Sequence, residues 1–480
     1  MADIKKEMIN GVFWSAIEKY SSLVVSIIIS MILARLLSPQ EYGVVAIATV
    51  IINFLQIFCT MGIGPAVIQR NDLTQQDINS IFTFSLCLGL ILSVLLFAFS
   101  VPIANFYKEI QLVPICRILS VQLLFASANM VPNALMAKDK RFKDIAKRTF
   151  ILQLSSGILS VIAAWNGAGV YSLLISPIIS SIGIFLWNRM YYKICIDWSF
   201  DIHPIKKIIS FSSYQFLFEF VNYFSRNLDK LIIGRHMTVD ALGYYEKSYR
   251  LMQLPLQNVT AVINPVLQPV LKVLQDDKND LSLKYNKIVR VVATLSFPIG
   301  IILSGMATEV IQFFYGNNWD AAIPVFRILS LSLPLQMILS TTGSIYMVCN
   351  NTKMQFWLGV RNTITTVAGF LIAALLFKTI EAVAWAWTIT LFINFVCTYL
   401  LMYRYVLRVS IIPMLKELLH PFICSILLGL FFYFCRNVQW PENLLITIFL
   451  KGGMSILIAI VYIQVSGQYN FIKLISKKMK

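Results

Sequence analysis

Residues 10–51 read NGVFWSAIEKYSSLVVSIIISMILARLLSPQEYGVVAIATVI. Two apolar runs lie on either side of a single polar break, SPQEYG, and each run is long enough for a helix that crosses a bilayer. Ser38-Pro39 in this break is a typical turn signal. The stretch therefore predicts a pair of transmembrane helices joined by a short loop.

The composition extends this conclusion to the whole chain. Of its 480 residues, 58% are hydrophobic and 13% are charged, whereas soluble domains carry about 25% charged residues. So few charges cannot cover a soluble fold of this length, and an aromatic content of 13% excludes a disordered chain. The remaining class is an all-α polytopic membrane protein.

Apolar windows of about 20 residues recur along the sequence between polar breaks. They predict fourteen transmembrane helices, at 10–35, 43–69, 79–105, 113–137, 145–165, 169–192, 207–233, 241–270, 285–314, 321–349, 354–377, 380–405, 413–435 and 443–466. The gaps between these windows leave no room for a soluble domain.

The basic residues predict the orientation of the helices. With the N-terminus in the cytoplasm, the inside segments hold 26 Lys and Arg residues and the outside segments hold 5. This bias follows the positive-inside rule, so both termini are predicted to be cytoplasmic. The rule also explains the basic clusters near 138–148 and 272–290 without a nucleic-acid partner, and contact with anionic membrane lipids is a second reading of them.

Internal repeats divide the chain. ARLLSPQEYG at 34–43 matches GRHMTVDALG at 234–243, and PICRILS at 114–120 matches PVFRILS at 324–330. These matches predict two parallel six-helix repeats with two further helices at the C-terminal end, which is a transporter plan that works by alternating access. We expect an N-terminal lobe at 1–192, a cytoplasmic linker at 193–206, a C-terminal lobe at 207–405, and helices 13 and 14 with a basic cytoplasmic tail at 406–480.

Polar side chains form stripes on several predicted spans, at 100° per residue. In the seventh span the stripe holds Gln215, Glu219, Asn222, Arg226, Asp229 and Lys230, and in the eighth it holds Glu246, Arg250, Gln253, Gln257, Asn264 and Gln268. Weaker stripes in the first two spans include Glu18, with Lys19 beside it, and Asn53 with Gln56. Ionisable groups in a membrane usually face a hydrated lumen, and the alternative is a set of interhelical hydrogen bonds that only hold the helices together.

Residues 10–51, and ARLLSPQEYG within them, resemble the opening of Wzx-type polysaccharide flippases of the multidrug/oligosaccharidyl-lipid/polysaccharide (MOP) exporter superfamily. The chain length and the plan of twelve plus two helices fit this family over essentially the whole sequence. The resemblance implies a V-shaped, two-lobed transporter that flips undecaprenyl-pyrophosphate-linked oligosaccharide units across the bacterial inner membrane. The flipped units would serve the synthesis of lipopolysaccharide O-antigen, capsule or exopolysaccharide. The expected partners are the lipid-linked oligosaccharide, membrane lipids, and the polysaccharide polymerase and chain-length machinery.

The stripes supply groups suited to this cargo. Arginine offers two parallel donors to a phosphate, and side-chain amides exchange hydrogen bonds with sugar hydroxyls. The residues expected to line the lumen are Lys19, Asn53, Gln56, Asn222, Arg226, Lys230, Arg250, Gln253 and Gln257.

Four acidic residues are candidates for coupling to H⁺ or Na⁺, because a carboxylate at membrane depth can load a cation. They are Glu18, Glu219, Glu246 and Glu309. The competing interpretation is structural: Glu246 with Arg250, and Glu219 with Arg226, are simple ion pairs along one helix.

Two other functions compete with the flippase. A cation-coupled multidrug exporter of the same superfamily should have an acidic lumen, whereas these stripes mix basic and acidic groups. A membrane-embedded polysaccharide polymerase usually has a large outer loop, whereas the predicted outer loops are short and cluster no catalytic residues. Eight cysteines and three histidines are scattered without ligand spacing, so we expect no metal, no other cofactor and no enzymatic activity.

Overall fold

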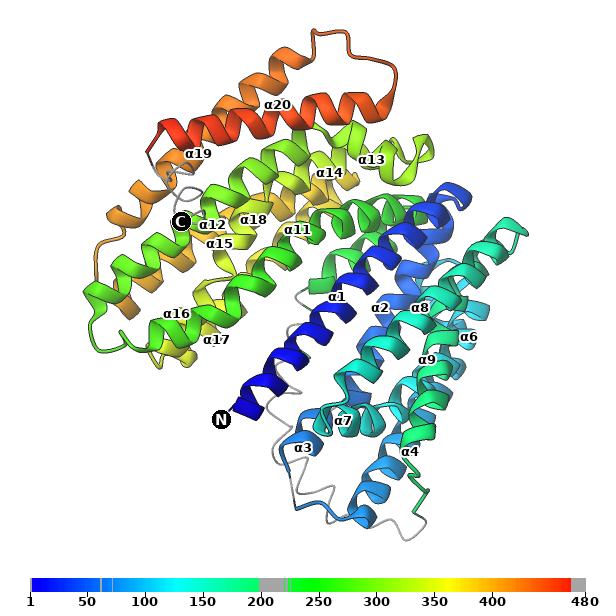
Figure 1. Cartoon of the computed structure of the whole chain (residues 1–480). Coiled ribbons are helices and arrows are strands. Elements are labelled where there is room, and N and C mark those ends of the chain that lie inside the picture. Colours follow the sequence, from blue (N-terminus) through cyan, green and yellow to red (C-terminus); the bar gives the residue numbers. More distant parts are fainter. Residues whose placement is uncertain are drawn as a thin grey trace. The chain divides into compact units, whose positions relative to one another are not determined.

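The computed structural model describes residues 2–60, 63–70, 72–197, 220, 223–224 and 226–467. This part of the chain is built from helices and contains no strand (Figure 1). The helices group into two compact units, residues 1–243 and residues 244–480.

The first unit begins with the long helix α1 (Ala2–Leu36), which packs along α8. Its other elements are α2 (Pro39–Thr60), α3 (Ile63–Gln69), α4 (Gln75–Ala98), α5 (Ser100–Tyr107), α6 (Leu112–Ala128), α7 (Met130–Lys138), α8 (Phe142–Trp165), η1 (Gly169–Tyr171), α9 (Ser172–Tyr191) and helical residues 226–236. Helix α6 packs against α4, α2 and α9, and therefore occupies the middle of this unit.

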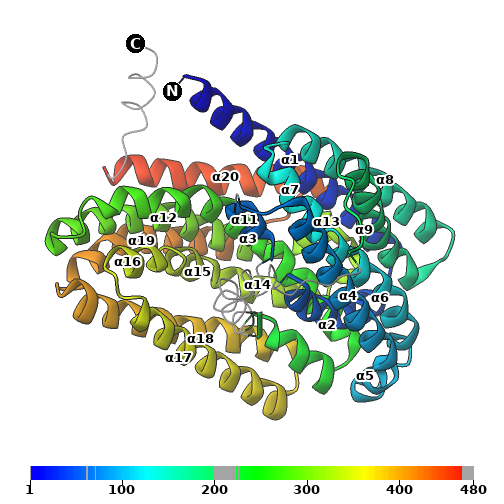
Figure 2. The ribbon, with the colours of Figure 1, turned by 90° about the horizontal axis from the view of Figure 1, so that it is seen from below.

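The second unit is centred on α12 (Lys278–Gly305), which packs against α14, α15 and α19. Its other elements are most of α11 (Val239–Lys272), α13 (Ala307–Tyr315), η2 (Asn317–Trp319), α14 (Ala322–Leu331), α15 (Leu333–Leu339), α16 (Thr342–Val348), α17 (Thr352–Ile372), η3 (Ala373–Phe377), α18 (Ile380–Leu401), η4 (Met402–Leu407), α19 (Ile412–Cys435) and α20 (Leu444–Val465). Helices α17 and α18 run side by side, as Figure 2 shows.

The membrane spans agree with the sequence prediction. The described residues contain 11 helices that are long and apolar enough to cross a membrane, or 12 if α14 with the α15–α16 segment is one span bent by 41°. The bend follows from Pro334, which lies in the first turn of α15 and cannot donate a backbone hydrogen bond.

Each of these spans falls on a predicted one. The predicted span 241–270 corresponds to α11, a helix of 34 residues that is more polar than these spans and is not among them. The predicted span 207–233 lies largely outside the described residues, so the total of fourteen stays a prediction.

The structure confirms the internal repeat. Both copies of the first motif end a helix at residue 36 or 236 and begin the next helix at Pro39 or Val239. The two copies of the second motif lie at the same place on α6 and α14. When residues 111–120 are aligned with residues 321–330, buried, half-buried and exposed positions coincide throughout, except that residue 118 is exposed and residue 328 is buried. Each copy follows a short helix that ends in Phe-Tyr, α5 or α13.

Local hydrogen bonds stabilise the helix start in both copies of the first motif. Ser38 and Glu41 form a reciprocal cap at the start of α2: the Ser38 amide donates to Glu41 Oε2 over 2.7 Å, and the Glu41 amide donates to Ser38 Oγ over 3.4 Å. In the second copy the Ala241 amide donates to Thr238 Oγ1 over 3.3 Å. The motif therefore shapes a helix start, as the sequence led us to expect.

The two copies also touch each other. A Cβ atom on Gly43 would lie 2.0 Å from the carbonyl oxygen of Val239, and a Cβ atom on Gly243 would lie 2.0 Å from that of Pro39. Only glycine permits this reciprocal approach of backbone to backbone.

The chain passes from the first unit to the second after Gly243. Residues 226–243 belong to the first unit. Just before them, the Tyr223 hydroxyl donates to the Val50 carbonyl oxygen of α2, and the Phe224 ring lies 5.2 Å from that of Phe54. Much of the predicted linker 193–206 lies outside the described residues, so the four predicted segments stay a prediction.

The described part of that linker is fixed to α4. Ser80 Oγ donates to Asp197 Oδ2 over 2.7 Å, and the Asp197 amide donates to Thr83 Oγ1 over 2.8 Å. The chain that leaves α9 is therefore extended but anchored.

Candidate functional site

Two members of the predicted polar stripe are exposed on helix α11. Arg250 and Gln257, two turns apart, are exposed, and Glu246 is half-buried. The opposite side packs within the second unit, where Ser248 Oγ donates to the Ala322 carbonyl oxygen over 3.0 Å and Leu251 is buried. Helix α11 thus presents a guanidinium and an amide on the side that its own unit does not cover.

Gln253 has a structural partner. Its Nε2 lies 3.4 Å from Gln336 Oε1 on α15, and Gln336 Nε2 donates to Ser332 Oγ over 2.9 Å. This contact is the interhelical hydrogen bond that the sequence left as an alternative to a lumen role for Gln253.

In the first unit, α2 and residues 226–236 bring together a second set of predicted residues. Asn53 on α2 is exposed and Gln56 is half-buried, while Arg226 is exposed and Lys230 is half-buried. The Phe54 ring of α2 lies 5.2 Å from that of Phe224, just before this segment, and a Cβ atom on Gly234 within it would lie 3.2 Å from Ile47 of α2. Both amides and both cations therefore belong to one helix pair.

The predicted residues of α1 lie at its contact with α8. Thr149 Oγ1 donates to Glu18 Oε1 over 3.1 Å, and Gln153 Nε2 donates to the Ser22 carbonyl oxygen over 3.0 Å. Lys19, the neighbour of Glu18, is exposed. Glu18 therefore joins α1 to α8, and its role in coupling stays a prediction.

Glu309 forms an ion pair that the sequence did not predict. It is 8% exposed on α13, and Lys451 Nζ of α20 donates to its carboxylate. Lys451 also lies 5.0 Å from the centroid of the Trp440 ring. Glu309 therefore joins α20 to the rest of the second unit, and coupling through it likewise stays a prediction.

Two predicted site residues, Asn222 and Glu219, lie outside the described residues, as does Gln215 of the same stripe. Among the residues that the structure does describe, no three His, Cys, Asp or Glu side chains are grouped so that they could hold a metal ion.

A buried arginine in the first unit was not singled out from the sequence. Arg148 was counted with the cytoplasmic cluster, but it is 5% exposed and sits two turns into α8. Its Nη1 donates to Asn133 Oδ1 over 2.9 Å and to Asn188 Oδ1, and Asn188 Nδ2 donates to Asn133 Oδ1 over 2.9 Å. The sequence feature that could have pointed to this buried network is an asparagine inside each of two apolar helices, Asn133 in α7 and Asn188 in α9.

Lys247 is a second buried cation. It is 2% exposed, and its Nζ lies 5.0 Å from the centroid of the Tyr315 ring and 6.0 Å from that of Trp319. These distances are typical of cation–π contacts. Lys247 thus points into the second unit, away from the exposed side of α11.

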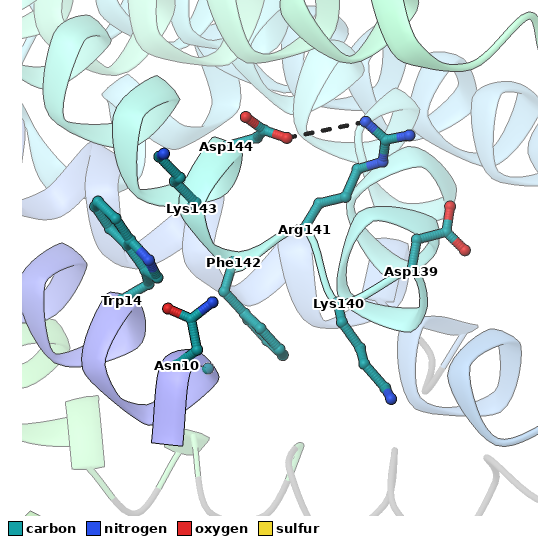
Figure 3. Close-up of a pocket in the computed structure, with 9 residues that line it drawn as sticks. Asn10, Trp14, Asp139, Lys140, Arg141, Phe142, Lys143 and Asp144 are labelled. Carbon is teal, nitrogen blue, oxygen red and sulfur yellow. Dashed lines mark ion pairs between the residues drawn. The ribbon is translucent and has the colours of Figure 1, made fainter. Parts of the chain in front are cut away.

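A pocket of about 390 Å³ lies where α1 meets the loop between α7 and α8. Its lining consists of Asn10, Gly11 and Trp14 on α1 and of residues 139–144 (Figure 3). The segment 139–144 carries three basic side chains, those of Lys140 and Arg141 in the loop and of Lys143 at the start of α8.

Comparison with known proteins identifies the relatives of this chain. It is 26% identical to the teichuronic acid biosynthesis protein TuaB of Bacillus subtilis over 434 residues, which cover 90% of this chain and 89% of TuaB. It is 22% identical to the lipopolysaccharide biosynthesis protein WzxC of Escherichia coli, over 88% of this chain and 86% of WzxC.

The fold also has a solved counterpart. The lipid II flippase MurJ, in an inward closed conformation, superposes with a TM-score of 0.75 over 95% of this chain and 99% of MurJ, at 17% sequence identity. At this identity the likeness concerns the fold alone, and it shows that the chain has the same helical architecture as MurJ. The family described as "Polysaccharide biosynthesis protein" matches residues 32–324, which is more than half of the chain. The chain is therefore a multi-pass membrane protein that belongs to the polysaccharide biosynthesis protein family.

Proposed function

We propose that this protein flips lipid-linked oligosaccharide units across a bacterial cytoplasmic membrane, from the cytoplasmic leaflet to the outer leaflet, for the synthesis of a surface polysaccharide. The observation that carries the proposal is the position of Arg226 and Arg250. Both are exposed on helices of a membrane transporter fold, although an exposed guanidinium at membrane depth is costly. The names of the relatives TuaB and WzxC support a role in polysaccharide synthesis.

The cargo explains why such groups are needed. A pyrophosphate with a large glycan cannot pass through hydrocarbon, because moving an unpaired ionised group into an apolar medium costs ~10 kcal/mol or more. Arginine side chains replace water around the phosphates, and Asn53, Gln56 and Gln257 exchange hydrogen bonds with the sugars. The apolar tail can stay in the lipid throughout the transfer.

The energy source belongs to the same proposal. Glu246 is the candidate that best fits H⁺ or Na⁺ loading, since it lies half-buried on the same helix as Arg250. Glu309, whose carboxylate pairs with Lys451, is a further candidate. Cytoplasmic termini and contact with a polysaccharide polymerase are further parts of the proposal.

The basic residues of the stripes favour this cargo over a cationic drug. A multidrug exporter of the same fold would attract its substrate with carboxylates, whereas Arg226, Lys230 and Arg250 would repel a cation. The anionic carrier lipid is the substrate that these charges suit.

Deletion of the gene in its own host tests the proposal. Lipid-linked intermediates should accumulate in the cytoplasmic leaflet and surface polymer should be lost, and the wild-type gene on a plasmid should reverse both effects. Normal polymer with no accumulation of intermediates would contradict the proposed function.

A further inference from the structure

The pocket between α1 and the α7–α8 loop has a defined position along both helices. Asn10 begins the predicted span 10–35, shortly after the mostly charged residues 3–7 of α1, and Phe142 is the first residue of the span Phe142–Trp165. A pocket at the start of two membrane spans lies at the depth of the lipid headgroups. Trp14, on the α1 side, is the residue type that favours this interface.

The two walls of the pocket are packed together. A Cβ atom on Gly11 would lie 3.2 Å from the Phe142 ring, so α1 and α8 are in close contact there. Farther along, the hydrogen bond from Thr149 to Glu18 holds the same two helices together. The pocket is therefore built into the helix pair.

The loop shape is fixed as well. Lys140 adopts a left-handed conformation with φ of 56°, and the amide of Arg141 donates to the Met136 carbonyl oxygen over 3.0 Å. This is a helix C-cap turn, and it places Lys140, Arg141 and Lys143 around one pocket.

Both acidic residues of the segment 139–144 have partners. Asp144 lies 3.9 Å from Arg141 (Figure 3), and Asp139 accepts a hydrogen bond of 2.5 Å from the Tyr192 hydroxyl. Burial, and secondly the bond to Asp139, raises the pKa of this hydroxyl, which follows the span Gly169–Tyr191 and stays protonated as the donor. The three cations thus outnumber the two acids around the pocket.

Trp14 adds an aromatic wall. Lys143 Nζ lies 5.5 Å from the centroid of its ring, and Figure 3 shows Asn10 one turn away on the same side of α1. A flat aromatic face beside an amide and several cations suits a phosphate that is joined to a polyhydroxylated group.

We propose that this pocket binds the phosphate-bearing headgroup of a membrane lipid on the predicted cytoplasmic side. Lys140, Arg141 and Lys143 would hold the phosphate, while Trp14 and Asn10 would contact the sugar or glycerol next to it. Two lipids carry this chemistry: an anionic phospholipid and the pyrophosphate-linked cargo. The assignment to cargo, as a receiving site before transport, rests on the proposed function.

Lipid binding to the purified full chain tests the site, by native mass spectrometry with undecaprenyl pyrophosphate, phosphatidylglycerol or neutral phosphatidylcholine. The variant K140A/R141A/K143A should bind at least one of the two phosphate lipids about tenfold more weakly or worse, the loss expected for one or two charge-assisted hydrogen bonds. The variant K147A/K193A/K353A is the matched control, because it removes three exposed basic residues that are also predicted to be cytoplasmic and do not line the pocket. Trp14→Phe should bind better than Trp14→Ala.

The outcomes separate the two lipids. A larger loss for undecaprenyl pyrophosphate assigns the pocket to cargo, whereas an equal or larger loss for phosphatidylglycerol supports a headgroup site and overturns the cargo assignment. Equal losses in the pocket variant and the control, or no loss in either, would overturn the site itself. If the triple variant does not fold, the single variants Lys143→Ala and Trp14→Ala decide the question in the same assay. The proposed function fails separately, through the gene deletion.

Discussion

Glu309 on α13 has two candidate roles, a structural one in an ion pair and one in ion coupling during transport. Its carboxylate pairs with Lys451, and the side chains of the two residues are 10% and 14% exposed. Replacing Glu309 by Gln leaves the ammonium without its anion, and breaking such a buried pair costs about 3–5 kcal/mol. We expect Glu309→Gln to lower the melting temperature of the purified protein clearly.

The double variant E309Q/K451M is the control for that prediction. It removes the stranded charge, so it should regain most of the lost stability. Normal transport by the double variant would assign Glu309 a purely structural role. A stable double variant that has lost transport would instead support ion coupling through Glu309.

Arg148 offers a second prediction, about a buried hydrogen-bond network. Replacing Arg148 by Ala leaves the Asn133 and Asn188 side chains with fewer donors, and a buried unsatisfied polar group costs about 1–3 kcal/mol. We expect Arg148→Ala to destabilise the protein by at least this amount in thermal unfolding followed by intrinsic fluorescence. The exposed neighbour Lys147 is the matched control, and equal stability of Arg148→Ala and Lys147→Ala would refute the structural role of the network.

Among the secondary-structure elements, the close approach of α2 and α11 at Gly43 and Gly243 makes a third prediction. An alanine at Gly43 would place its methyl carbon 2.0 Å from the Val239 carbonyl oxygen, so the backbones must separate. Overpacking of this kind costs about 1–3 kcal/mol or more. We expect Gly43→Ala to reduce the yield of folded protein and its melting temperature, as measured by fluorescence-detected size-exclusion chromatography.

Gly429 on α19 provides the control for this prediction. A Cβ atom there meets no heavy atom within 4 Å, and alanine is favoured over glycine in a helix by about 0.5–1 kcal/mol. Gly429→Ala should therefore leave the protein as stable as the wild type, or slightly more stable. If Gly43→Ala behaves in the same way, the backbones are not in contact at this crossing.

The elements also show what the sequence can and cannot predict. Ser38 and Glu41 act within one turn, so their helix start is visible in the sequence, and the apolar windows reveal the spans in the same local way. The partners Arg148–Asn188 and Glu309–Lys451 are 40 and 142 residues apart. Such pairs depend on helix packing, which periodicity alone does not predict.

For the whole molecule, the polar stripes supplied the candidate residues of the lumen, and their role in transport stays a prediction. On α11, Arg250 and Gln257 of the stripe are both exposed, and a period of 3.6 residues places positions two turns apart on one side of a helix. The direction of Gln253, which meets Gln336, and that of Lys247, which points into the second unit, follow instead from neighbouring helices. A stripe therefore selects candidates, and packing decides which of them are open to a substrate.

The exposed arginines of both units lead to the prediction that bears most directly on transport. If Arg226 and Arg250 hold phosphate groups of the cargo, Ala at either position removes a charge-assisted hydrogen-bond donor worth about 1.5–3 kcal/mol, or roughly a tenfold to hundredfold loss of transport. Stability should hardly change, because both side chains are exposed. The measurement is complementation of the deletion strain, with surface polymer and membrane-bound protein quantified together.

Lysine at these positions should restore part of the transport, since it keeps the charge but not the paired donors. Arg436→Ala is the control, because this exposed arginine follows α19 and lies outside the stripes. Full complementation by both alanine variants would exclude the two arginines from the transport mechanism.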